Sequence, residues 1–234
     1  MVALTPEFLF SALSIVLIDV LLGGDNAVVI ALVVKSLPPK ERTIGIAAGA
    51  GGAVVLRIIF TFFAARLLQV SLIKFFGGLL ILWIAVRLLS DAAEDPTSNS
   101  GAKSLWRAMW LILVADLTMS IDNILAVAAA SKGNLTLLIF GLGLSIPFVI
   151  FTSSMLSRLM DRFPIVIYLG AAILGRVGGD MMITDPWIVG MLHPSHAWEI
   201  GVQAFLAIAV VIAGKLLARR VPAPGEAEKK STPP

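Results

Sequence analysis

The stretch DVLLGGDNAVVIAL, residues 19–32, places two aspartates and an asparagine inside an apolar run. That run extends from Phe8 to Val34, and Asp19 and Asp25 are its only ionisable residues. One charge at the centre of a bilayer costs roughly 3 kcal/mol on insertion scales. Acids at these positions therefore need a partner, which can be a proton, an arginine or a bound cation. The stretch predicts a membrane span that carries a functional site.

The composition of the whole chain is typical of a polytopic membrane protein. Of its 234 residues, 58% are hydrophobic and 14% are charged, and the mean hydropathy is +0.96. Soluble domains are about half apolar and about a quarter charged. The chain has no cysteine, which excludes disulfides, thiolate metal sites and cysteine catalysis. Its basic pI comes from Lys and Arg that lie between the apolar runs, so we expect no nucleic-acid partner.

Seven segments are predicted to be spans, since a membrane helix needs roughly 20 mostly apolar residues. They lie at about 8–33, 44–66, 70–89, 105–130, 135–156, 164–180 and 198–218. The sixth is short and is interrupted by GRVGGD, residues 175–180. We expect a single transmembrane domain over 1–220, followed by a disordered cytoplasmic tail, VPAPGEAEKKSTPP, over 221–234.

The distribution of Lys and Arg predicts the direction of the spans, because cytoplasmic loops carry an excess of these residues. With the N-terminus outside, the outer loops contain only three of them, Arg66, Lys74 and Lys132. Arg57 and Arg176 lie within spans, and every other Lys and Arg falls inside. The bias therefore predicts an all-α membrane protein with an N-out, C-in layout.

A second copy of the opening pattern occurs as DLTMSIDNILAVAA, residues 116–129, at an offset of 97 residues from Asp19 to Asp116. Each copy has an aspartate, five residues, an Asp-Asn pair and an apolar run. The copies lie in the first and fourth predicted spans, so they cross the membrane in opposite directions. This indicates a 3+3 inverted repeat, over about 8–89 and 105–180, with an added helix at 198–218. Inverted repeats place substrate and ion sites at their interface, near the midplane.

The repeated segments supply six candidate metal ligands: Asp19, Asp25, Asn26, Asp116, Asp122 and Asn123. In each copy the first aspartate and the asparagine are seven residues apart and share a helical face. Gly23 and Gly24 weaken the first copy and are expected to open its helix, which frees backbone carbonyls. Oxygen ligands of these kinds suit Mg²⁺, Ca²⁺ and Mn²⁺, whereas zinc and copper sites usually recruit Cys or His. We expect a transported divalent cation and no tightly bound cofactor.

Four further residues are accessory candidates: Asp180, Arg57, Met119 and Ser120. Arg57 lies past the middle of its span, and we expect it to be a counter-ion for the carboxylates of the ion-free site. Asp180, at the outer end of the sixth span, either completes the site or faces water. Met119 either offers a sulfur to the ion, which favours Mn²⁺, or packs in the core. Ser120 adds a hydroxyl to the second copy.

With the paired D-x5-D-N segments, GAGGAVVLRIIF at 49–60 and the seven-span layout, the sequence resembles the TerC family. Within that family it is most similar to the YjbE-type members, and the family belongs to the LysE exporter superfamily. The resemblance covers nearly all of residues 8–218. It implies a multi-pass protein of the bacterial plasma membrane that exports metal ions, chiefly Mn²⁺, from the cytoplasm. It also places Asp25, Asn26, Asp122 and Asn123 in the acidic motif of the family.

Two other functions share some of these features. The superfamily also contains amino-acid exporters, for which we expect fewer membrane acids and more room for an organic substrate. An intramembrane aspartyl protease needs two membrane aspartates too, but it uses Gly-x-Gly-Asp and Tyr-Asp segments. Here the tetrad is LGGD, residues 22–25, and Tyr168 has no acid beside it. We therefore expect that the protein is not an enzyme but a transporter that works by alternating access. Protons are expected to move in the direction opposite to the metal ion. The sequence does not predict the oligomeric state.

Overall fold

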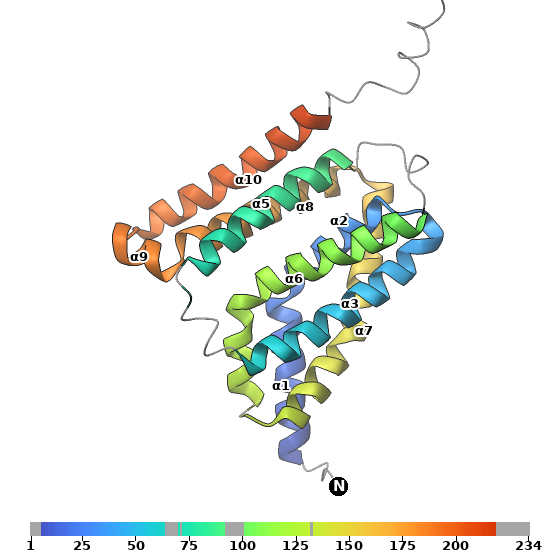
Figure 1. Ribbon diagram of the computed structural model, residues 1–234, viewed down its shortest axis with the longest axis vertical. Coiled ribbons are helices and arrows are strands. Elements are labelled where there is room, and N and C mark those ends of the chain that lie inside the picture. The colour runs from blue at the N-terminus through green and yellow to red at the C-terminus, as the bar shows by residue number, and fades with distance from the viewer. Residues whose placement is uncertain (1–5, 64–69, 71, 92–100, 132, 219–234) are drawn as a thin grey trace, which may run out of the picture.

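The computed structural model describes residues 6–63, 70, 72–91, 101–131 and 133–218, without the side chains of 101–104, 122 and 125 (Figure 1). Every regular element in these residues is a helix, which confirms the expected class for the described part of the chain. The predicted tail over 221–234 lies outside the described residues. The helices are α1 (Pro6–Leu22), α2 (Gly24–Lys35), α3 (Pro39–Phe62), α5 (Ile73–Asp91), α6 (Gly101–Ser131), α7 (Leu135–Arg162), α8 (Ile165–Ile183), α9 (Pro186–Leu192) and α10 (His196–Ala218).

Each predicted span coincides with a helix, or in the first case with the pair α1 and α2. Five helices are long and apolar enough to cross a membrane, namely α3, α5, α7, α8 and α10, and the bent pair α1–α2 passes the same test when it is taken as one broken span. The predicted span over 105–130 lies in α6, which is 31 residues long but is not among them. The described residues thus support five or six spans, and the seventh stays a prediction.

The interruption predicted at GRVGGD is wrong, because α8 runs without a break from Ile165 to Ile183. The glycines are instead packing positions. A Cβ built on Gly175 would lie 2.7 Å from the Cα of Ala207 on α10. A Cβ on Gly178 would lie 2.9 Å from the carbonyl oxygen of Gly78 on α5, and the reciprocal distance is 2.4 Å. Small residues let membrane helices approach closely, and here they hold α8 against both neighbours.

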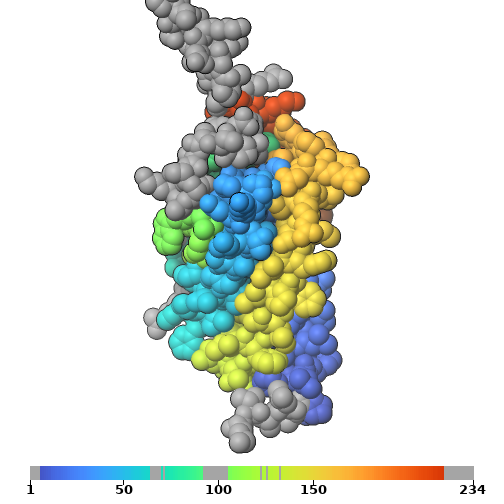
Figure 2. Space-filling model, turned by 90° about the vertical axis from the view of Figure 1, so that its right-hand side faces the viewer, coloured from blue at the N-terminus to red at the C-terminus, as the bar shows by residue number. Residues whose placement is uncertain are grey.

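The helices form two groups, which Figure 1 shows separately. One group contains α5, α8 and α10, which pack on one another. In the other group, α3 packs against α6, and α7 packs against α1, α2 and α3. Figure 2 shows α7, in yellow, running along one face between α1 and α3. The second group therefore combines helices from both halves of the sequence, and it contains both Asp-Asn segments.

Apolar side chains cover much of the outer surface. On α10 the side chains of Phe205, Ile208 and Ile212 are 69%, 60% and 53% exposed. Such a surface is unfavourable in water and is suited to contact with lipid.

Two ion-pair groups lie at helix ends on the predicted cytoplasmic side. Asp161 at the end of α7 pairs with Lys35 and, at 2.7 Å, with Arg42, and Asp91 pairs with Arg107 at 2.9 Å.

Asp185, in the predicted outer loop, is fully buried and joins two helices. Its Oδ1 accepts the Trp187 N–H at 2.9 Å, which caps α9, and its Oδ2 accepts the Phe75 N–H at 3.3 Å, in the first turn of α5. Removal of this carboxylate would leave two backbone donors without their acceptor. The sequence did not predict this capping role.

We expect Asp185→Ala to lower the free energy of unfolding by ~1–2 kcal/mol, since both caps are lost together. The measurement is the midpoint of thermal unfolding in detergent, followed by tryptophan fluorescence. Glu199→Ala is the matched control, because the carboxylate of Glu199 contacts only the exposed His196 ring, at 3.4 Å, among the described residues. Equal midpoints for the two variants would show that Asp185 does not stabilise this end of the molecule.

Candidate functional site

The opening stretch of the sequence forms two helices that meet at Gly23 with a bend of 56°. The Gly23 N–H donates to the Asp19 carbonyl at 2.8 Å, and the Asn26 N–H donates to the Gly23 carbonyl at 3.1 Å. A Cβ on Gly23 would lie only 2.5 Å from the Asp19 carbonyl oxygen, whereas a Cβ on Gly24 would meet nothing within 4 Å. The predicted opening of this helix is therefore confirmed, and Gly23 is the residue that allows it.

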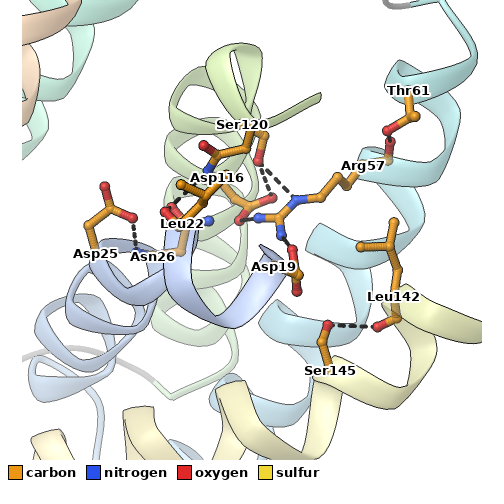
Figure 3. A network of polar contacts seen from close by, with 11 residues as sticks. Asp19, Leu22, Asp25, Asn26, Arg57, Thr61, Asp116, Ser120, Leu142 and Ser145 are labelled. Carbon is orange, nitrogen blue, oxygen red and sulfur yellow. Dashed lines mark hydrogen bonds and ion pairs between the residues drawn. The ribbon is translucent and has the colours of Figure 1, made fainter. Parts of the chain in front are cut away.

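Arg57, on α3, lies between the acids of the two sequence copies (Figure 3). Its Nη1 pairs with Asp19 of α1, and its Nη2 donates to Asp116 Oδ1 of α6 at 2.6 Å. Its Nε donates to Ser120 Oγ at 3.0 Å, and that hydroxyl donates to Asp116 Oδ2 at 3.3 Å. We call Arg57, Asp19 and Asp116 the ion triad. This is the counter-ion contact that the position of Arg57 in its span predicted.

The ion triad is almost fully buried. The side chains of Arg57, Asp19 and Asp116 are 4%, 1% and 5% exposed. Charges removed from water are tolerated only when they are paired and hydrogen-bonded, and loss of one partner costs about 3–5 kcal/mol. With both carboxylates ionised, the triad carries one more negative than positive charge. It therefore remains attractive to a cation.

Several polar atoms beside the bend are buried without a partner among the described residues. They are Asp19 Oδ2 and both Oδ1 and Nδ2 of Asn26. The Asn26 residue is only 3% exposed. Buried polar atoms normally have a hydrogen-bond partner, and an orphaned atom calls for an explanation such as an ion or water. Two oxygens of the first copy are thus available to a ligand.

Among the described side chains, the polar atoms of the second copy have more hydrogen-bond partners than those of the first copy. Its Asn123 donates from Nδ2 to the Leu22 carbonyl at 3.2 Å, so it binds a carbonyl freed by the bend in the first copy. The two Asp-Asn segments therefore meet across α1 and α6. Asp25, which is half-buried, accepts the Asn26 N–H at 2.9 Å on its own Oδ1. Asp122 belongs to α6, but its side chain lies outside the described residues.

The remaining candidates lie in different surroundings. Met119 is 5% exposed and belongs to the main hydrophobic core. Asp180 accepts a hydrogen bond from Gln203 Nε2 of α10 at 2.7 Å, so this contact lies within the group of α5, α8 and α10. Arg176, the other arginine within a span, donates to Gln203 Oε1 at 3.4 Å. Gln203 connects these two residues, and nothing in its sequence context indicated this.

The six predicted ligands do not form one compact acidic group among the described side chains. Within those residues no three His, Cys, Asp or Glu side chains are close enough together to hold a metal ion. The geometry accounts for this, because Arg57 stands between Asp19 and Asp116, and Asp25 follows the bend. In the described conformation Arg57 pairs with both triad acids, so its single positive charge offsets one of their two negative charges.

Comparison with known proteins gives matches over most of the chain. The model of the family described as "Integral membrane protein TerC family" matches residues 4–222. The chain is 36% identical to uncharacterized membrane protein YjbE of Bacillus subtilis strain 168, over 92% of this chain and 98% of that protein. It is 30% identical to uncharacterized membrane protein YceF of the same organism, over 64% and 62% of the two chains.

A more distant relative is longer than this chain. The UPF0053 inner membrane protein YoaE of Escherichia coli strain K12 is 24% identical over 87% of this chain, which covers 43% of YoaE. No solved structure matches.

Substitutions at the two glycines should have opposite effects on stability. We expect Gly23→Ala to destabilise the protein by ~1–3 kcal/mol, because the methyl group must displace the Asp19 carbonyl. Gly24→Ala should be neutral or stabilising by up to ~1 kcal/mol, since alanine favours the start of α2. Thermal unfolding of both variants in detergent measures the difference. The same midpoint for both would mean that the bend does not depend on a close approach at Gly23.

Proposed function

The chain belongs to the TerC family of integral membrane proteins, and from this premise we propose that it exports a divalent metal ion, Mn²⁺ in the first place. It is a multi-pass protein of the bacterial inner membrane, in keeping with its apolar helices and its relatives. The proposal concerns the substrate and the mechanism. It rests above all on one observation: acids from corresponding positions of the two sequence copies meet at one buried cationic group.

The proposed layout has seven spans, in a 3+3 inverted repeat with the N-terminus outside. The helix contacts support it, because an internal twofold axis would exchange α1–α2 with α6, α3 with α7, and α5 with α8. Under that exchange the contact between α3 and α6 corresponds to the contact of α7 with α1 and α2, and both exist. The reciprocal approach of Gly78 and Gly178 fits a crossing of α5 and α8 on such an axis. In Figure 1, α6 also changes direction along its length, as α1 and α2 do.

The proposed ion site lies between α1–α2 and α6. Its ligands are Asp25, Asn26, Asp122 and Asn123, joined by the two triad acids. The unpartnered Asp19 Oδ2 and Asn26 Oδ1 support this choice, because both are buried oxygens of the kind that hard divalent cations prefer. The carbonyls freed at the bend offer further oxygens, as half-helix ends do in other transporters. A protease would need a nucleophilic water at two acids, whereas here both triad acids are paired with Arg57.

Alternating access is the proposed mechanism. The two repeats are interleaved, with α6 and α7 packed among α1, α2 and α3, and the main hydrophobic core extends from this group into α5, α8 and α10. We propose that the group of α1, α2, α3, α6 and α7 moves against the group of α5, α8 and α10, which exposes the site to the two sides of the membrane in turn. Carboxylates that release a cation gain a proton or an arginine, so proton counter-transport is part of the proposal.

Loss of one motif acid should abolish transport without loss of the protein from the membrane. We expect Asp25→Ala and Asp122→Ala to reduce Mn²⁺ efflux from expressing cells to the level of cells without the protein, because each removes a charged ligand. Asp91→Ala is the control, since Asp91 pairs with Arg107 at the end of α5, away from the ion triad. Normal efflux by either motif variant, with equal amounts in the membrane fraction, would exclude the proposed site.

The metal content of cells with and without the protein identifies the substrate. The contents of Mn, Ca, Mg, Zn and Fe are measured by mass spectrometry. We expect the protein to lower the cellular content of Mn more than that of the other four metals. An effect on zinc alone would contradict the oxygen-ligand chemistry of the site. Unchanged contents of all five metals, together with altered amino-acid export, would favour the small-solute alternative.

A further inference from the structure

The ion triad has one cation for two acids, and among the described residues the second half of the chain contributes no second cation to it. At the offset of 97 residues between the two sequence copies, Arg57 corresponds to position 154, which is Ser154, a neutral residue. A single guanidinium therefore pairs with the first acid of both sequence copies.

The geometry of this guanidinium favours the simultaneous contact. Its two terminal nitrogens each take one carboxylate, and its Nε is held by Ser120. Arg57 is on α3, which carries neither Asp-Asn segment, so its side chain enters from outside the pair of motif helices. The aliphatic part of an arginine side chain is flexible, whereas its planar guanidinium group holds several N–H donors in a fixed arrangement that suits carboxylates. The contact can form and break without rebuilding α1 or α6.

A transporter that exports an ion must return without it. During that return the two triad acids stay in the low-dielectric interior, where unpaired charges are strongly disfavoured. A site whose carboxylates gained neither a proton nor an arginine would stay in one orientation until another cation arrived. It could exchange one ion for another, but it could not complete a cycle of net export.

We propose that Arg57 is a resident counter-cation, which takes the place of the metal between Asp19 and Asp116 and so allows the ion-free transporter to return. Arriving metal displaces the guanidinium from the two acids, and release of the metal lets it rebind. This inference rests on the proposed function and adds to it the residue that separates net export from ion exchange.

The test uses the full-length protein in proteoliposomes. Net efflux is measured with Mn²⁺ inside and none outside, and exchange with equal Mn²⁺ on both sides and a radioactive tracer inside. The ratio of net efflux to exchange does not depend on the amount of protein. The variants are Arg57→Gln, which removes the charge, and Arg57→Lys, which keeps a charge that reaches one acid at a time. Arg176→Gln is the matched control, an arginine within a span that contacts Gln203.

We expect Arg57→Gln to lower the ratio by at least about tenfold, with a smaller fall for Arg57→Lys and none for Arg176→Gln. A purely structural role for Arg57 would reduce both rates together and leave the ratio unchanged, which would overturn the inference. If Arg57→Gln does not fold, Arg57→Lys decides, and a ratio equal to that of the wild type overturns the inference. If the wild type transports no divalent ion in either assay, the proposed function fails, and the inference fails with it.

Discussion

Two carboxylates that share one guanidinium in the membrane interior constrain the whole architecture. Asp19, Asp116 and Arg57 come from α1, α6 and α3, so these three helices must converge at one depth. The charges are too deeply buried to be neutralised by water, and each would be destabilising if another were absent. Helix packing, the bend at Gly23 and the hydroxyl of Ser120 all serve to keep the three groups together.

The two sequence copies have unequal roles in this arrangement. The second copy forms one long helix in which three described polar groups have partners, because Ser120 bonds to Asp116 and Asn123 bonds to the Leu22 carbonyl. The first copy is broken at Gly23 and leaves Asp19 Oδ2 and the Asn26 amide without a described partner. A ligand would therefore gain most from the first copy, and the second copy positions it. Inequality of this kind follows from the difference between Gly-Gly and Ser-Ile ahead of the two Asp-Asn pairs.

Much of the fold could be predicted from the sequence, because hydropathy locates membrane helices and glycine pairs locate weak points in them. The role of Arg57 was also predictable, since a charge in the middle of a span needs an opposite charge. The glycines of GRVGGD were misread as a break, because their packing partners, Ala207 and Gly78, are distant in sequence. The capping role of Asp185 could not be predicted either, since the Phe75 N–H that it accepts is 110 residues away.

The central claim is that Arg57 and a divalent cation compete for Asp19 and Asp116. Its most direct test is equilibrium binding of Mn²⁺ to the purified protein, followed by the electron paramagnetic resonance signal of the free ion. Binding should weaken when Asp19 and Asp116 are replaced by Asn. Arg57→Gln should bind Mn²⁺ at least about tenfold more tightly than the wild type, because the competing cation is gone. Equal or weaker binding by a folded Arg57→Gln protein would contradict the account.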